Sequence, residues 1–227
     1  KPHPPVWIPG AGSLETWGWT LEQDYVYCYL SYGGYNSSQT LMRGFWEEVD
    51  RRGAEPNPYR AGFLQLVAVS ETDEQMDEYA PYIEYFYNKC MHVPDYFTNA
   101  PGYRTVKSVR SGVKGAQSLA RIQREANFTW KDYVDNGNVI AGGPSTVRDR
   151  MKEAIEKLRV GHMMVLCQFG DMPRELASKN TELFATEVMP HLRNMWSDYE
   201  DRWWPKPLKG SQMARPVEFT QTLQREM

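Results

Sequence analysis

The sequence has few of the features that mark membrane, nucleic-acid-binding or disulfide-stabilised proteins. No apolar run approaches the ~20 residues that a membrane-spanning helix needs. Lys and Arg number 26 against 29 Asp and Glu, and the resulting net charge of -3 gives no basic surface for nucleic acid. The three cysteines, Cys28, Cys90 and Cys167, lie far apart and without metal-ligand spacing. We therefore expect free thiols in a reducing cytoplasm, and neither a nucleic-acid nor a membrane partner.

What remains is the composition of a globular protein. The chain has 227 residues, enough for one large domain or two small ones, with 41% hydrophobic and 24% charged residues. The first residues, Lys1 to Pro5, are polar and proline-rich, unlike a signal peptide. Aromatic residues are abundant, which suits a pocket for a flat ring and suits an interface equally well.

The first motif is a glycine-rich turn between a short predicted strand, Val6 to Pro9, which we expect to be buried, and a predicted helix. Ser13 stands at the position of a helix N-cap, and Glu15 places negative charge in the first turn. Glycines at this place leave backbone N–H groups uncovered at the positive end of the helix, where phosphate binds well. The alternative is an ordinary strand-to-helix turn that needs glycine only for its backbone angles.

The remaining pattern alternates between strands and helices, which predicts a parallel sheet with crossover helices. Further strands are predicted at residues 25–32, 61–69 and 162–168, with a short extended piece at 138–141. Helices are predicted at about 15–23, 37–52, 72–89, 130–134, 145–158 and 173–192. A closed (β/α)₈ barrel needs eight strands. Four predicted strands fit either a small open sheet or half of a barrel whose first half is absent.

Several motifs, in order, resemble the bacterial luciferase-like flavin-dependent monooxygenases. The resemblance begins with the proline-rich start and its Gly-Ala-Gly-Ser-Leu-Glu-Thr turn, and continues with Leu-Ser-Tyr-Gly, residues 30–33, at the end of the second strand. Residues 139–147 resemble the start of a helix that in the family reads Gly-Ser-Pro-Glu-Thr-Val, although Gly143 and Ser145 depart from it. The stretches at 161–173 and 182–192 resemble the closing strand and helix.

The resemblance implies an α/β fold of the (β/α)₈ TIM-barrel type, with this chain supplying roughly strands 5–8 and their helices. Residues 1–195 would form this C-terminal half, with an insertion at about 92–135. Residues 196–227 would form a C-terminal tail, either an arm packed on a neighbouring chain or a partly disordered segment.

The same resemblance implies an oxidoreductase: a monooxygenase that uses reduced FMN and O₂ on a small organic substrate. A flavin reductase would supply the reduced FMN, and a homo- or heterodimer is expected. A deazaflavin-dependent oxidoreductase of the same fold is one alternative, and a non-catalytic half-barrel that needs its missing N-terminal half is another. A phosphosugar enzyme would need an acid/base pair at the strand ends, which the sequence does not offer.

Site residues follow from the rule that such barrels place their chemistry at the carboxyl ends of the strands. The resemblance assigns the flavin phosphate to the turn after the first strand, and the flavin ring or substrate to the ends of the second and last strands. No catalytic residue is predicted, because flavin itself activates oxygen, and no metal site is predicted. The predicted residues are Gly10, Ala11, Gly12 and Ser13 for the cofactor, and Leu30, Ser31, Tyr32, Gln168 and Phe169 for the ring or substrate. The alternatives are a core position for Tyr32 and a cap of the following helix for Gln168.

Overall fold

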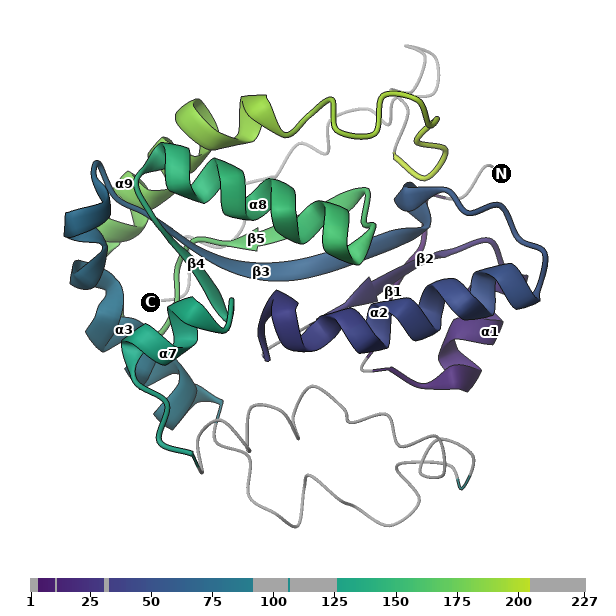
Figure 1. The fold of residues 1–227 in the computed structure, drawn as a ribbon, viewed down its shortest axis with the longest axis horizontal. Coiled ribbons are helices and arrows are strands. Elements are labelled where there is room, and N and C mark those ends of the chain that lie inside the picture. The colour runs from purple at the N-terminus through teal and green to yellow at the C-terminus, as the bar shows by residue number, and fades with distance from the viewer. Residues whose placement is uncertain (1–3, 11, 31–32, 92–105, 107–125, 205–227) are drawn as a thin grey trace, which may run out of the picture.

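The computed structural model describes residues 4–10, 12–30, 33–91, 106 and 126–204. These residues form a five-stranded parallel sheet flanked by helices, so the prediction of a parallel α/β fold is confirmed (Figure 1). The fifth strand is the stretch predicted only as an extended piece. The strands are β1 (Trp7–Gly10), β2 (Val26–Tyr29), β3 (Ala61–Val69), β4 (Val139–Gly142) and β5 (His162–Leu166).

The long strand β3 has three neighbours, and the register shows how it accommodates them. Leu66 pairs with Val139 of β4 and with Leu166 of β5, so these two strands lie on opposite edges of β3. Phe63 pairs with Tyr29 of β2 and also with β5. It follows that β2 and β4 share one edge, β2 along its first half and β4 along its second. Within the described residues the sheet is open, because β1, β4 and β5 each pair with only one other strand. Closure into a (β/α)₈ barrel stays a prediction.

The helices largely follow the apolar periodicity, but two long predicted helices are interrupted. Residues 72–89 form a 3₁₀ segment (Asp73–Tyr79), an α-helix and a π-turn (Phe86–Cys90), because Pro81 has no N–H and can only enter the first turn of the α-helix. The last predicted helix continues from Leu183 as π and 3₁₀ turns (Phe184–Val188 and Met189–His191). The α-helices are α1 (Leu14–Glu22), α2 (Gly34–Arg51), α3 (Ala80–Tyr85), α7 (Trp130–Asp135), α8 (Pro144–Leu158) and α9 (Arg174–Leu183).

Apolar side chains cover both faces of the sheet, in the alternation that a strand imposes. Phe63 and Val67 of β3 pack under α1, α2 and α8, which lie side by side along one face (Figure 1). Leu66 and Ala68 face the other way, against the cluster that contains residues of α3 and α7. Strand β1 is only half-buried, with Pro9 exposed, so the prediction of a buried first strand is wrong.

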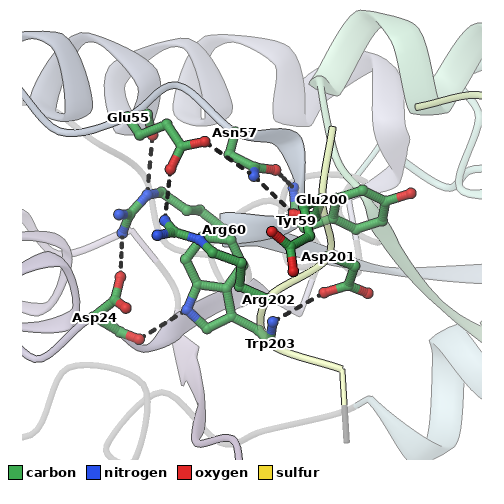
Figure 2. A network of polar contacts seen from close by, with 9 residues as sticks. All are labelled: Asp24, Glu55, Asn57, Tyr59, Arg60, Glu200, Asp201, Arg202 and Trp203. Carbon is green, nitrogen blue, oxygen red and sulfur yellow. Dashed lines mark hydrogen bonds and ion pairs between the residues drawn. The ribbon is translucent and has the colours of Figure 1, made fainter. Parts of the chain in front are cut away.

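The C-terminal segment 196–204 packs on this chain's own sheet, at the amino ends of its strands (Figure 2). Trp203 is 4% exposed and packs against Val26 and Cys28 of β2, and its indole N–H donates to the carbonyl of Asp24 at 2.9 Å. The segment therefore covers the start of the face opposite α1, α2 and α8. Residues 205–227 of the predicted tail lie outside the described residues.

Candidate functional site

The glycine-rich turn lies at the carboxyl end of β1, directly before α1. A Cβ atom on Gly10 would stand 2.6 Å from the ring of Tyr27, and Gly12 has a φ of +96°. Both positions therefore need glycine for structural reasons, whatever the turn binds. Ala11 lies outside the described residues.

Ser13 caps α1 as the sequence predicts, and its hydroxyl is already engaged. Its oxygen accepts a hydrogen bond from the Thr16 N–H at 3.5 Å, and the hydroxyl donates to Oε2 of Glu15 at 2.8 Å. The helix end offers backbone N–H donors to an anion. The Glu15 carboxylate stands at the same end, so a bound phosphate would have to displace it from Ser13.

The side chain of Tyr27 lies directly beneath this turn. Its ring is fully buried, stacks on Phe45 at 5.0 Å between centroids and meets Trp17 edge-on. Burial raises the pKa of the Tyr27 hydroxyl far above its usual value, although hydrogen bonds with the Trp17 indole and the Gly12 backbone act in the opposite direction. The hydroxyl is therefore a neutral group under the turn and cannot act as a base there.

The end of β2 lies next to this turn, because Gly10 pairs with Tyr29. Leu30, the residue that follows, is half-buried. The structure therefore brings Leu30 close to Gly10, Gly12 and Ser13. Ser31 and Tyr32, the other two residues predicted here, lie outside the described residues.

The end of β5 is in a different place. Leu166 pairs with Leu66, so Gln168 lies level with Ala68, five residues beyond Phe63, where β2 ends. With ~3.3 Å per residue and ~4.8 Å between strands, Gln168 is roughly 20 Å from Gly10. Gln168 is exposed, whereas Phe169 is 2% exposed and packs near Tyr79. The structure thus does not place these two residues beside the turn.

Asp73 and Asn180 hold the carboxyl ends of β3 and β4 in place, and neither was predicted from the sequence. The Asp73 carboxylate accepts from the Gly143 N–H at 2.6 Å and from the Thr146 hydroxyl at 2.8 Å, so it caps α8, which has no cap of its own. The buried amide of Asn180 bonds to backbone groups of Val67, Val69 and Cys167, each at 2.8 Å. The only sequence signal was the helix start at Gly143-Pro144, which lacks a capping side chain.

Other kinds of site find no support in the described residues. No cluster of three or more His, Cys, Asp or Glu side chains there could hold a metal ion. None of the helices in the described ranges is long and apolar enough to cross a membrane. Asp77 accepts a hydrogen bond from the Trp130 indole at 2.8 Å and so joins α7 to the 3₁₀ segment.

Solved structures of oxidoreductases share this fold. The FMN complex of the oxygenating constituent of 3,6-diketocamphane monooxygenase from Pseudomonas putida has a TM-score of 0.54 at 18% identity, over 82% of this chain and 48% of that chain. Monooxygenase RslO1 from Streptomyces bottropensis has a TM-score of 0.52 at 14% identity, over 84% of this chain and 49% of that chain. The coenzyme F420-dependent tetrahydromethanopterin reductase from Methanopyrus kandleri has a TM-score of 0.51 at 17% identity, over 83% of this chain and 51% of that chain.

These comparisons define the class of fold and no more. The chain spans about half the length of the structures that it matches. Identities of this size support a shared architecture, which is an α/β fold with a parallel sheet. No protein-family model matches the chain, and no curated protein matches it.

Proposed function

We propose that this chain carries the phosphate-binding side of a flavin-dependent oxidoreductase, with monooxygenation of a small organic substrate by reduced FMN and O₂ as the reaction. The observation that carries the proposal is the turn of Gly10, Gly12 and Ser13 at the N-terminus of α1 and the carboxyl end of β1. Carboxyl ends of parallel strands are where α/β folds bind ligands. The shared fold with an FMN-binding monooxygenase supports the choice of cofactor.

The donors at this turn fit a phosphate group. Ser13 adds a hydroxyl beside the N-terminus of α1, whose first backbone N–H groups have no partner within the helix. Glu15 would turn into solvent, which its exposed position allows, and the Ser13 hydroxyl would then donate to the phosphate. The half-buried Leu30 would contact the flavin ring or the substrate. A bound flavin would supply the oxygen chemistry, while the chain binds it, orients it and excludes water.

Coenzyme F420 is the alternative cofactor. The reductase from Methanopyrus kandleri shares the fold and is F420-dependent, and the same turn would serve the phosphate of a deazaflavin. In that case hydride transfer would replace reaction with O₂. A flavin reductase is the proposed partner only in the FMN case, because it would regenerate the reduced flavin.

A second candidate function is a non-catalytic half-barrel that becomes active only with a chain that carries the other strands. Its support is the sheet itself, in which β1, β4 and β5 each pair with a single strand within the described residues. All four apolar residues from Met163 to Leu166 are half-exposed, whereas β2 and β4, equally apolar, are fully buried. A strand of this composition is typical of a sheet covered on both faces.

Anaerobic titration of the whole chain with reduced FMN, and separately with reduced F420, tests the proposal. We expect Ser13→Ala to weaken flavin binding and Glu15→Gln to tighten it, because the second change removes the carboxylate that competes for Ser13. Ser37→Ala, a loss of a hydroxyl near the end of β2, is the matched control and should leave the affinity unchanged. Oxygen uptake then separates the FMN reaction from hydride transfer.

The two candidate functions predict different results in that titration. Saturable binding by the chain alone favours the flavin enzyme. Absence of binding, with binding restored by a polypeptide that supplies further strands, favours the half-barrel. Equal affinity of the wild-type chain and both variants at Ser13 and Glu15 would refute the phosphate site at this turn.

A further inference from the structure

A hollow of about 470 Å³ lies between α1 and the end of α2, next to the glycine-rich turn. Each helix contributes residues three and four positions apart, which share one face of a helix. The charged and small residues of its lining are Glu15, Gly18 and Glu22 from α1, and Glu48, Arg51 and Arg52 from the end of α2. Glu15 belongs to the turn as well, because its carboxylate accepts a hydrogen bond from the Ser13 hydroxyl at 2.8 Å.

The guanidinium of Arg52 is held in a fixed position in this hollow. Its Nε donates to Glu48 at 2.6 Å and its Nη1 to Glu22 at 2.8 Å, so Nη2 has no hydrogen bond within the described residues. Glu48 is a firm anchor, because its side chain is only 10% exposed and accepts two further hydrogen bonds from Arg51. The hydrogen bonds from Arg51, and then those from Arg52, lower the pKa of Glu48 to about 2 despite its burial, so the anchor stays charged.

Gly18 brings Nη2 of Arg52 close to α1. A Cβ atom at Gly18 would clash with Nη2, so the guanidinium lies directly on the backbone of the helix. Glu15 stands three residues before Gly18, and Cβ positions at this spacing are ~5–6 Å apart. The Glu15 carboxylate reaches ~3.5 Å beyond its Cβ and a hydrogen bond adds ~2.9 Å, so Nη2 lies within its range.

Glu15 therefore has two alternative partners. In the structure it accepts from Ser13, and so it occupies the hydroxyl that a bound phosphate would need. Turned toward the hollow, it would pair with Arg52 and release Ser13. A phosphate at the turn would favour this second position, because like charges repel. The hollow is open to solvent, since Glu15 and Trp19 at its wall are exposed, and no buried space has to form.

We infer that Glu15 is a gate of the phosphate site, closed on Ser13 when the turn is empty and held open by Arg52 when phosphate is bound. This inference rests on the proposed function and deepens it, because it makes Arg52 a positioning residue that never touches the ligand. Arg52 stabilises only the open state, so its pairing with Glu15 adds to the affinity for phosphate. A single exposed ion pair is worth up to about fivefold in affinity.

Anaerobic titrations of the whole chain with reduced FMN, and with reduced riboflavin, which lacks the phosphate, test the gate. We expect Arg52→Gln to weaken the binding of FMN about three- to fivefold and to leave that of riboflavin unchanged. Arg51→Gln is the matched control and should leave both affinities unchanged. It removes the same charge and two bonds to Glu48, whereas the atoms nearest to a Cβ at Gly18 all belong to Arg52. In a Glu15→Gln background, Arg52→Gln should have no effect, because the carboxylate that it draws away is already absent.

A crystal structure of Ser13→Ala without flavin tests the second position of the gate directly. Loss of the hydroxyl removes the present partner of Glu15, whose carboxylate should then lie ~2.9 Å from Nη2 of Arg52. A carboxylate that stays where it is, or that points into bulk solvent, overturns the gate.

The titrations distinguish failure of the gate from failure of the proposed function. Absent binding, or equal affinity of the wild-type chain for FMN and riboflavin, refutes the phosphate site in this chain and the gate with it. Tighter binding of FMN than of riboflavin, with Arg52→Gln equal to the wild type or to Arg51→Gln, refutes the gate alone. A loss of riboflavin affinity in Arg52→Gln also refutes the gate, because a general role of Arg52 in packing would explain that result.

Discussion

Trp203 should contribute more to stability than any other residue of the C-terminal segment. Its ring is 4% exposed and packs on Val26 and Cys28, while its indole N–H satisfies the carbonyl of Asp24. The guanidinium of Arg60 lies 4.9 Å from the ring centroid, and Arg60 is itself buried and paired with Asp24 at 3.0 Å. Removal of the ring would open a cavity and expose one side of this cation.

We expect Trp203→Ala to lower the free energy of unfolding by about 3–5 kcal/mol, the usual cost of truncating a buried tryptophan. Trp203→Phe keeps most of the packing but leaves the Asp24 carbonyl without its donor, so about 1–2 kcal/mol should be lost. The adjacent Trp204 is 60% exposed and serves as the control. Its replacement by alanine should cost less than about 1 kcal/mol.

Urea unfolding followed by circular dichroism measures these differences, with equal slopes required before midpoints are compared. Thermal unfolding should agree, with a melting temperature roughly 10 °C lower for Trp203→Ala. A loss below about 1 kcal/mol for Trp203→Ala, or an equal loss for Trp204→Ala, would refute the view that residues 196–204 are an integral part of the sheet's packing.

Three further predictions follow from single contacts. Burial lowers the pKa of His162 below its usual 6.5. The contribution of neutral His162 to stability is therefore complete above pH 6.5 and is lost as the pH falls below 6.5. The urea midpoints measured at about pH 7.5 and at about pH 5.5 should differ less in His162→Gln than in the wild type. Asp73→Ala removes the cap of α8 and should cost about 1–2 kcal/mol in the same assay, whereas Asp73→Asn should recover part of it. Gly10→Ala forces a methyl group against Tyr27 and should cost about 1–3 kcal/mol, and a stability equal to the wild type would show that the ring can move aside.

The local elements could be predicted from the sequence because each has its own short-range signal. The apolar run at 61–69 is β3 to the residue, and Pro144 with the apolar stripe that follows gives α8 within one residue. Such short-range signals fail where a proline interrupts a helix or where a strand is very short. Pro81 breaks the helix predicted at 72–89, and β4 has only four residues, too few to distinguish a strand from an extended loop.

Contacts between distant parts of the chain left no such signal. Asp73 caps a helix whose first residue comes about 70 positions later, and Trp203 donates to a carbonyl 179 positions earlier. Neither residue stands in a periodic pattern that marks its partner. The candidate turn at Gly10 was predictable because its glycines, its cap and its helix are adjacent in sequence, whereas the Glu15 carboxylate that competes with an anion there depends on a side-chain rotamer.

The strands of the sheet end at different levels, and these levels decide which of the predicted site residues can contact the same ligand. Strand β3 runs six residues, or about 20 Å, beyond the level at which β2 ends, from Phe63 to Val69. Beyond the end of β2, strand β4 pairs with the same edge of β3. Between these two strands the Tyr35 N–H donates to the backbone carbonyl of Gly137. A cofactor at the Gly10 turn therefore meets residues that follow β1 and β2, while Gln168 stands level with the far end of β3. Because Gln168 is exposed and stands beyond the end of β5, it is separated from the Gly10 turn both along and across the sheet. Gln168→Ala should accordingly leave the flavin affinity as it is in the anaerobic titration, and a weakened flavin affinity would return Gln168 to the site.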